Sequence, residues 1–247
     1  MLTYQSPEKF SVLGLPVHLV ENYPHWLVES LQQGRGTHVV TLNAEMTMQA
    51  RRNPSLFTVI ENADLVIPDG AGVVLYLRFI LKQQVKRFPG IELAEGLLQE
   101  LSRKAPSTKV FFYGGSPGVA AKAAEFWQQQ VPNLNFVGTH SGYHSPETEK
   151  ILLETLTELQ PQVIFVGLGV PRQELWIAKN RTLCPQAIWI GVGGSFDIWS
   201  GGKTRAPKWL ANNNLEWLYR LYQEPWRWRR MLALPEFLFQ ALISKSH

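Results

Sequence analysis

One carboxylate, Asp69, stands in the sequence where a general base could act. It follows the apolar run 65–67 and Pro68, and the glycines Gly70 and Gly72 open an apolar stretch after it. This pattern is typical of a short buried strand that ends at a proline and turns into a helix. Because open α/β sheets bind ligands at the carboxyl ends of their strands, a carboxylate here could take a proton from a substrate hydroxyl. The alternative is that Asp69 only caps the following helix.

Polar groups also follow the other expected strands. They are Thr41 and Asn43, the Gly114-Gly115-Ser116 turn, Gln173, and Ser195 with Asp197. The glycine-rich turn is either a phosphate cradle or a plain strand-to-helix turn. A carboxylate with amides, hydroxyls and arginines such as Arg87 suits transfer from a diphosphate-activated donor. In such a reaction the carboxylate deprotonates the acceptor hydroxyl, and guanidinium groups stabilise the leaving diphosphate.

Metal and nicotinamide chemistry find little support in the sequence. The aspartates Asp64, Asp69 and Asp197 form no D-x-D pair that could hold a divalent ion. His140 and His144 are four residues apart, but the Ser-Gly between them favours a loop over a helical metal site. The glycine-rich turn that begins at residue 167 lacks the third glycine of a dinucleotide fingerprint. We therefore expect neither a metal nor another cofactor.

The elements that must carry these groups alternate between short apolar runs and amphipathic helical patterns, from about residue 11 to 195. This alternation is typical of an α/β fold, and we expect a Rossmann-like, doubly wound and mainly parallel sheet. After a β-like start over 10–19, the expected strands are 37–42, 65–67, 109–113, 135–138, 163–167 and 187–192. The expected helices are 24–33, one opened by 43–45, 54–61, 71–81, 91–104, 119–130, 146–159 and one ending near 181.

The pattern changes near residue 200. Beyond Gly201-Gly202 we expect helices only, over 207–223, 225–232 and 235–243, each begun by a proline at a position that tolerates one. The chain is therefore expected to comprise an α/β catalytic domain over 1–200 and a helical C-terminal appendage over 201–247.

The excess of basic charge is confined to this appendage. From Lys203 onward there are eight Lys or Arg against three acidic residues, whereas residues 1–202 carry 16 basic and 17 acidic ones. Four of the nine tryptophans also lie there. Basic residues interleaved with aromatics indicate an anionic partner, which is a membrane surface, a diphosphate or a nucleic acid. The acidic balance of the remainder argues against a nucleic acid. A contact between copies of the chain is the alternative to a membrane interface.

Composition places the chain among soluble or surface-bound proteins of a reducing compartment. Its 247 residues, 45% of them hydrophobic, are enough for a sizeable core. The single cysteine, Cys184, cannot form an intramolecular disulfide. The sequence begins without a basic and then apolar leader, and no window approaches the roughly 20 apolar residues of a membrane span. We therefore expect no secretion signal and no spanning helix.

Eight ordered motifs, over about residues 10–232, resemble the WecG/TagA/CpsF family of glycosyltransferases. The motifs are Thr41-Leu42-Asn43-Ala44-Glu45, Pro68-Asp69-Gly70, Arg87 before Gly90, Gly138 with Gly142-Tyr143, Gly167 to Glu174, Gly191 to Asp197, Arg205-Ala206-Pro207 and Leu215 to Leu221. Their number and their order argue against chance similarity.

The resemblance implies an inverting, metal-independent transferase that moves a sugar from a UDP donor to an undecaprenyl-diphosphate-linked acceptor in cell-surface polysaccharide synthesis. The best-known type of member transfers N-acetylmannosamine to lipid-linked N-acetylglucosamine. The resemblance also implies a cytoplasmic protein that its basic appendage holds peripherally at the inner face of the cell membrane.

The resemblance assigns roles to individual residues as well. Asp69 falls on the proposed base, and Arg87 falls on a second catalytic position. Together with the strand-end groups above, the expected substrate-binding residues are Thr41, Asn43, Gly115, Tyr143, Gly169, Gln173, Arg220, Arg227 and Arg230. The three appendage arginines are expected to close the active site. Pro225 interrupts the helical stripe on which they would lie, so a bend must aim them at the sheet.

Three departures from the family pattern concern the expected sugar site. Glu92 stands where many members have Asp, Arg172 where many have Lys, and His144 where many have an aromatic residue. None of them removes a proposed catalytic group, but they leave the identity of the donor sugar open. A nucleotide-sugar-binding regulator without turnover is the alternative function, and assembly into a homo-oligomer also stays open.

Overall fold

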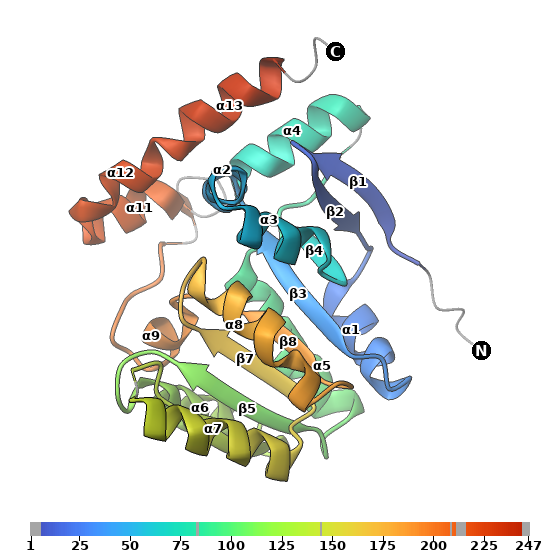
Figure 1. Ribbon diagram of the computed structural model, residues 1–247, viewed down its shortest axis with the longest axis vertical. Helices are drawn as coiled ribbons and strands as arrows, with labels where there is room; N and C mark the ends of the chain where they lie inside the picture. The colour runs from blue at the N-terminus through green and yellow to red at the C-terminus, as the bar shows by residue number, and fades with distance from the viewer. Residues whose placement is uncertain (1–5, 83, 144, 208, 211–215, 244–247) are drawn as a thin grey trace.

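Figure 1 shows the computed structural model, which describes residues 6–82, 84–143, 145–207, 209–210 and 216–243. Its centre is a six-stranded parallel sheet in the order β4-β3-β8-β7-β5-β6. The strands are β3 (Thr37–Leu42), β4 (Leu65–Pro68), β5 (Lys109–Gly114), β6 (Asn135–His140), β7 (Val163–Gly167) and β8 (Ile188–Gly191). The expected doubly wound, Rossmann-like α/β fold is confirmed.

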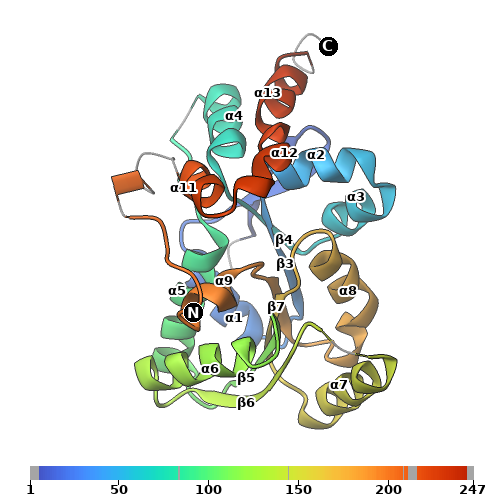
Figure 2. The same ribbon diagram turned by 90° about the vertical axis from the view of Figure 1, so that its left-hand side faces the viewer.

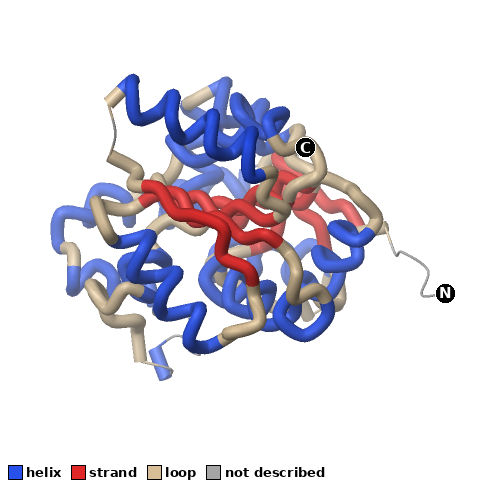
Figure 3. The backbone as a smooth tube through the Cα atoms, turned by 90° about the horizontal axis from the view of Figure 1, so that it is seen from below, coloured by secondary structure: helices blue, strands red, loops and turns tan. Residues whose placement is uncertain are grey.

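The sheet is covered on both faces, which explains why its strands are continuous apolar runs. Every residue of β3, β4, β7 and β8 is buried. Figure 3 views the red sheet from below, with blue helices on either side of it. Pro68 is tolerated in β4 because it is the last residue of an edge strand. All carboxyl ends meet at one edge, where Leu42 lies beside Pro68 and Gly114 beside Gly167.

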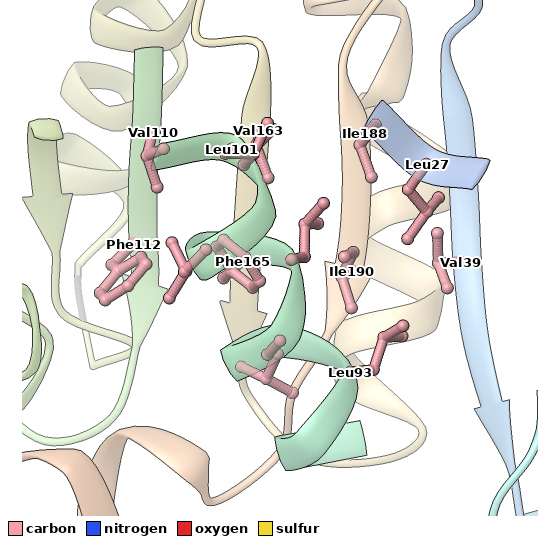
Figure 4. Packing of buried hydrophobic residues seen from close by; sticks show 14 of the residues in the cluster. Leu27, Val39, Leu93, Leu101, Val110, Phe112, Val163, Phe165, Ile188 and Ile190 are labelled. Carbon is pink, nitrogen blue, oxygen red and sulfur yellow. The ribbon is translucent and has the colours of Figure 1, made fainter. Parts of the chain in front are cut away.

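One face of the sheet carries four helices that form a single core. They are α1 (Tyr23–Gln32), α5 (Gly90–Lys104), α6 (Val119–Gln130) and α9 (Ser195–Trp199). Their apolar side chains pack on alternate strand residues, among them Val39, Phe112, Phe165 and Ile190 (Figure 4). This core fixes α5, and with α5 the loop that leads into it, against the carboxyl ends of β3 and β4.

The opposite face has two separate cores. α2 (Ala44–Arg52), α3 (Pro54–Glu61) and α4 (Ala71–Leu81) share the first core with β3 and β4. α7 (Pro146–Leu159), α8 (Arg172–Asn180) and η1 (Arg181–Leu183) share the second with β5, β7 and β8. Figure 2 shows α3, α7 and α8 on this side of the sheet and α1, α5 and α6 on the other.

The β-like start of the chain is an antiparallel hairpin. β1 (Glu8–Val12) and β2 (Leu15–Leu19) pair through a turn in which Leu13 and Gly14 have φ of 51° and 88°. The hairpin lies beside the edge strand β4, where His18 Nδ1 accepts the Val66 N–H at 2.9 Å. The His18 side chain thus accepts a backbone hydrogen bond that a further strand would otherwise accept. This contact protects the edge of the sheet from pairing with other chains.

The C-terminal segment is helical, as expected, and its last helix shares a core with the sheet domain. It contains α11 (Glu216–Gln223), η2 (Pro225–Arg227), α12 (Trp228–Met231) and α13 (Ala233–Ile243). α13 packs on α2 and α4 (Figure 1), and Phe237 is fully buried there against Gly72 and edge-on to Tyr76. The Arg52–Glu236 ion pair adds a polar contact between α2 and α13.

Most predicted element boundaries lie within two residues of those in the structure. The start over 10–19 is two strands, because the turn at Leu13 and Gly14 reverses the chain. The final helix begins at Ala233 and not at Pro235, since a proline is also tolerated inside the first turn. Of the expected helix 207–223, the structure describes 209–210 and 216–223 as helical. In the described ranges, no helix combines the length and apolarity needed to cross a bilayer.

Candidate active site

The turn that carries Asp69 is fixed on both sides by backbone hydrogen bonds. The Asp69 N–H donates to the Leu42 carbonyl at 2.9 Å, and the Phe88 N–H donates to the Pro68 carbonyl at 3.1 Å. The half-buried Asp69 therefore lies between the end of β3 and the loop that leads into α5. α4 has Gly70 as its N-cap, and none of the described side chains caps it. The N-cap position of α4 is thus Gly70 and not Asp69.

Two close approaches bring the β3 end and the α5 loop to this turn. Gly70 has φ of 81°, and a Cβ on it would lie 3.1 Å from the Cβ of Asn43. A Cβ on Gly90 would lie 3.0 Å from Thr41 Oγ1. The positive φ of Gly70 favours glycine there, and a Cβ at either position would press on side chains at the β3 end. Arg87, half-buried on the same loop, is thereby held at this end of the sheet.

Asn43 and Thr41 make different contacts within the protein. Asn43 is the N-cap of α2, and its Oδ1 accepts the Met46 N–H at 2.9 Å. Thr41 is buried, and its side chain lies against the first residue of α5. Both residues thus have a structural contact at the β3 end, and their expected role in substrate binding stays a prediction.

The turns after β5 and β6 form a second group of predicted residues. The Gly115 N–H donates to the Gly167 carbonyl at 3.0 Å, and the Gly142 N–H donates to the Gly115 carbonyl at 2.9 Å. Tyr143 follows, with 68% of its side chain exposed and its N–H bonded to Ser141 Oγ at 3.1 Å. β5 is four strands from β4, so Gly115 is about 19 Å from the Asp69 turn at the usual strand spacing.

The turns after β7 and β8 lie between the Asp69 turn and the Gly115 turn. The Gln173 side chain hydrogen-bonds to both of these middle turns. Its Oε1 accepts the Gly169 N–H at 3.1 Å and the Gly193 N–H at 3.0 Å. Gln173 is 3% exposed, so the structure places it beneath the turns and not on the open edge of the sheet. Gly169 and Gly193 have φ of 73° and 52°, and nothing in the described chain lies within 4 Å of where their Cβ would be. The two turns therefore face open space.

The structure brings one appendage arginine to the β3 end. Arg230 Nε forms an ion pair with Glu45 at the start of α2, and Glu45 also accepts from Gln49 Nε2 at 2.9 Å. This contact places the Arg230 guanidinium beside Glu45, which is two residues after the Asn43 of the T-x-N motif. The side chains of Arg220 and Arg227 lie outside the described part of the structure.

Two ion-pair clusters attach the beginning of the appendage to the sheet domain. Lys203 Nζ lies 3.2 Å from Asp197 Oδ2 and 3.0 Å from Glu224 Oε1. Burial alone would lower the pKa of Lys203, but its pairs with Glu224 and Asp197 outweigh this effect and raise the pKa. Asp197, a strand-end candidate, is therefore engaged by a lysine. A pocket of about 480 Å³ lies beside this cluster, between residues 201–204 and 223–226.

The second cluster contains Glu92, the first of the three departures from the family pattern. Arg205 forms an ion pair with Glu92 and lies 3.5 Å from Glu95 Oε2, so the acid at 92 joins α5 to the appendage. The second departure, Arg172, is the first residue of α8, and its Nη2 donates to the Gly142 carbonyl of the turn after β6 at 3.4 Å. The third departure, His144, lies outside the described residues. In the parts of the chain that the structure describes, no three His, Cys, Asp or Glu side chains are grouped so that they could hold a metal ion.

Comparison with known proteins decides the family. Residues 10–247 match the model of the glycosyl transferase WecG/TagA/CpsF family. The chain belongs to this family. It is 38% identical over 212 residues to an N-acetylglucosaminyldiphosphoundecaprenol N-acetyl-beta-D-mannosaminyltransferase of Bacillus spizizenii strain W23. It is 34% identical, over the same length, to the protein of that name from Bacillus subtilis strain 168. Each similarity covers 86% of this chain and 81% of the relative.

The protein is therefore a glycosyltransferase, as the eight motifs predicted. The family match extends to residue 247 and so includes the helical segment, which joins the sheet domain through Arg230, Arg205 and Lys203. These contacts were not predicted from the sequence, and neither were the roles of Glu174 and His38. The signal that was available for His38 is a histidine inside a strand that reads as buried.

Proposed function

We propose that this glycosyltransferase moves N-acetylmannosamine from a UDP donor to N-acetylglucosamine that is linked through diphosphate to a polyprenol. Both Bacillus relatives are named for this sugar and this acceptor. The observation that carries the proposal is the placement of Asp69. Its carboxylate stands at the carboxyl end of β4, where the Asp69 N–H is bonded to β3 and Gly70 is the N-cap of α4.

In the proposed reaction Asp69 is the general base. Its carboxylate takes the proton from the acceptor hydroxyl while the hydroxyl oxygen attacks the anomeric carbon of the donor sugar. The bond from that carbon to the UDP oxygen breaks on the opposite face, and the electron pair leaves with UDP. One displacement of this kind inverts the configuration of the anomeric carbon.

The leaving diphosphate needs positive charge, and the proposal assigns this role to arginines in place of a metal. Arg87 lies on the loop beside the Asp69 turn, and Arg230 lies over the neighbouring β3–α2 turn. Guanidinium groups bind diphosphate oxygens in a bidentate way and stay protonated throughout. The proposal therefore includes neither a metal nor another cofactor.

Exposed apolar side chains support attachment of the enzyme to a membrane surface. They gather on α4 and on the C-terminal helices: Leu75, Phe79 and Ile80; Trp217, Leu218 and Tyr222; Trp226 and Trp228; and Leu238, Phe239, Leu242 and Ile243. α13 and α4 pack together, so their outer apolar faces are neighbours. With the basic excess beyond Lys203, this surface suits the inner face of an anionic bilayer. A contact between copies of the chain is the alternative.

The decisive experiment is a UDP-release assay with purified enzyme, a polyprenyl-diphosphate N-acetylglucosamine acceptor and a panel of UDP-hexoses and UDP-N-acetylhexosamines. We expect release with UDP-N-acetylmannosamine and a product of inverted anomeric configuration by NMR. The reaction should persist in the presence of a chelator. UDP-sugar binding by calorimetry without UDP release would instead support the alternative of a regulator without turnover.

A further inference from the structure

A buried pair, Glu174 and His38, lies directly behind Gln173. Glu174 Oε1 accepts from Gln173 Nε2 at 3.0 Å, and Glu174 Oε2 lies 2.9 Å from His38 Nε2. The exposed fractions of His38, Glu174 and Gln173 are 1%, 0% and 3%. The pair joins residues 136 positions apart in the sequence, one on β3 and one on α8. A carboxylate at such depth is stable only where hydrogen bonds satisfy its oxygens, and these two contacts do so.

The pair determines how the Gln173 side chain is oriented. An amide has one acceptor oxygen and one donor nitrogen, and either can point toward a given neighbour. Because Glu174 accepts the Gln173 Nε2, Oε1 must point toward the N–H groups of Gly169 and Gly193. A Cβ on Gly191 would overlap both the amide and the carboxylate, so the two side chains pack directly against the backbone at the end of β8.

The two glycine turns lie on the path that the proposed donor must follow. β8 and β7 are two and three strands from β4, so the turns are about 10 to 14 Å from the Asp69 turn. They face open space, and the Gly115 turn continues the same edge beyond them. A donor whose sugar reaches Asp69 and whose diphosphate meets Arg87 and Arg230 can therefore extend its nucleoside over Gly193 and Gly169.

We propose that His38 is a positioning residue for donor binding. Through Glu174 it fixes the Gln173 amide, and through that amide it sets the distance between the two glycine turns over which the donor nucleoside extends. The inference rests on the proposed function, because it names the residue that shapes the donor site. His38 is remote from the reacting atoms and takes no part in the proton transfer.

This role has a kinetic signature. The enzyme contacts the nucleoside both in the ground state and in the transition state. Loss of such uniform binding raises KM and leaves kcat unchanged. A change in the base would have the opposite pattern, a fall in kcat with the affinity for UDP retained. The KM-to-kcat split therefore separates positioning from chemistry.

Two amide substitutions at position 38 test the proposal. The amide nitrogen of His38→Gln can occupy the place of Nε2 and keep the hydrogen bond to Glu174. The amide nitrogen of His38→Asn falls near the place of Nδ1 and cannot reach the carboxylate. For His38→Asn we expect the KM for the UDP-sugar and the Kd for UDP to rise roughly tenfold, the effect of one buried hydrogen bond. We expect kcat to stay within about twofold, and His38→Gln to behave like the wild type.

His25→Asn is the matched control, since His25 pairs with Glu100 on the α1–α5 surface and contacts no turn of the site. UDP affinity is measured by calorimetry and folding by circular dichroism and thermal unfolding. If His38→Asn does not fold, His38→Met, which also lacks the donor, replaces it. A His38→Asn enzyme with a lower Tm but wild-type Kd and KM would overturn the inference. If the wild-type enzyme itself neither binds nor releases UDP, the proposed function fails instead.

Discussion

The carboxylate of Asp69 occupies a turn whose geometry was only partly visible in the sequence. Proline, aspartate and glycine after an apolar run predicted a strand end, but the same residues also fitted a helix cap. In the structure the N-cap position of α4 is Gly70 and not Asp69. All three aspartates interact with other groups of the protein. Asp64 binds Arg181 at 2.6 Å, and Asp197 binds Lys203 at 3.2 Å.

Replacement of Asp69 by asparagine should remove the base and keep the shape of the turn. We expect kcat for Asp69→Asn to fall by about 10² to 10⁴, the usual contribution of a general base. The Kd for UDP should not change, since the amide is isosteric with the carboxylate. Turnover is measured by UDP release and affinity by calorimetry. Asp64→Asn, at the other end of β4, is the control, and undiminished turnover in Asp69→Asn would exclude the base role.

At the scale of elements, the edge strand β4 depends on a histidine of the neighbouring hairpin. His18 Nδ1 accepts the Val66 N–H, so the ring must be unprotonated at Nδ1. Burial lowers the pKa of His18, the charge of Lys9 lowers it further, and Asp64 partly opposes both. In the unfolded chain this histidine takes up its proton near pH 6.5, before the folded protein does.

This difference in pKa predicts a loss of stability in weak acid. Above pH 6.5 His18 is neutral in both states and contributes no pH dependence. As the pH falls below 6.5 the unfolded state binds the additional proton, so the free energy of unfolding decreases. Urea unfolding at pH 7.5 and 5.5, followed by tryptophan fluorescence, measures this decrease. In His18→Asn the Oδ1 can accept the same N–H without titrating, and we expect a smaller decrease. An equal decrease in that variant would show that His18 is not responsible.

The docking of α13 depends on one aromatic side chain. Phe237 is fully buried between α4 and α2, whereas Phe239 on the same helix is 61% exposed. Phe237→Ala should lower the free energy of unfolding by about 3 to 5 kcal/mol, the cost typical of a large-to-small change in a core. Phe239→Ala should change it by less than about 0.5 kcal/mol. Urea unfolding compares the two, and equal stabilities would mean that α13 is not docked through Phe237.

At the scale of the whole molecule, the exposed apolar surface extends over α4 as well as the C-terminal helices. α4 belongs to the sheet domain, and its outer residues Leu75, Phe79 and Ile80 are exposed. Its sequence is apolar all round, which is typical of a helix that is buried on every side. Membrane attachment would therefore involve the sheet domain together with the appendage, and would orient the active site toward the lipid.

This surface predicts how vesicle binding responds to single charges. Phe79→Glu on α4 should reduce flotation with vesicles of phosphatidylglycerol and phosphatidylcholine, because it introduces an anion into the apolar contact. Activity with a short-chain acceptor in solution should be retained. Phe126→Glu, exposed on α6 and remote from this surface, is the control. Unchanged flotation of Phe79→Glu would exclude α4 from the contact, and dimerisation by sedimentation would instead support a contact between copies.

The sequence by itself determined the local structure and the chemistry of the strand ends. Apolar runs of strand length, proline and glycine at the turns, and eight ordered motifs were enough to predict a parallel α/β sheet with Asp69 at its edge. The family match confirms the resemblance on which the activity was predicted. These features are local, since hydrophobic period and turn residues are read over a few positions of the chain.

Only the tertiary structure decided which distant residues meet. The order of the strands placed Gly169 and Gly193 between Asp69 and Gly115, and packing of α8 on β3 joined Glu174 to His38. Docking of α13 on α2 brought Arg230 to Glu45, 185 positions away in the sequence. Such pairs follow from the side-chain packing of whole elements, and no short stretch of the chain encodes them.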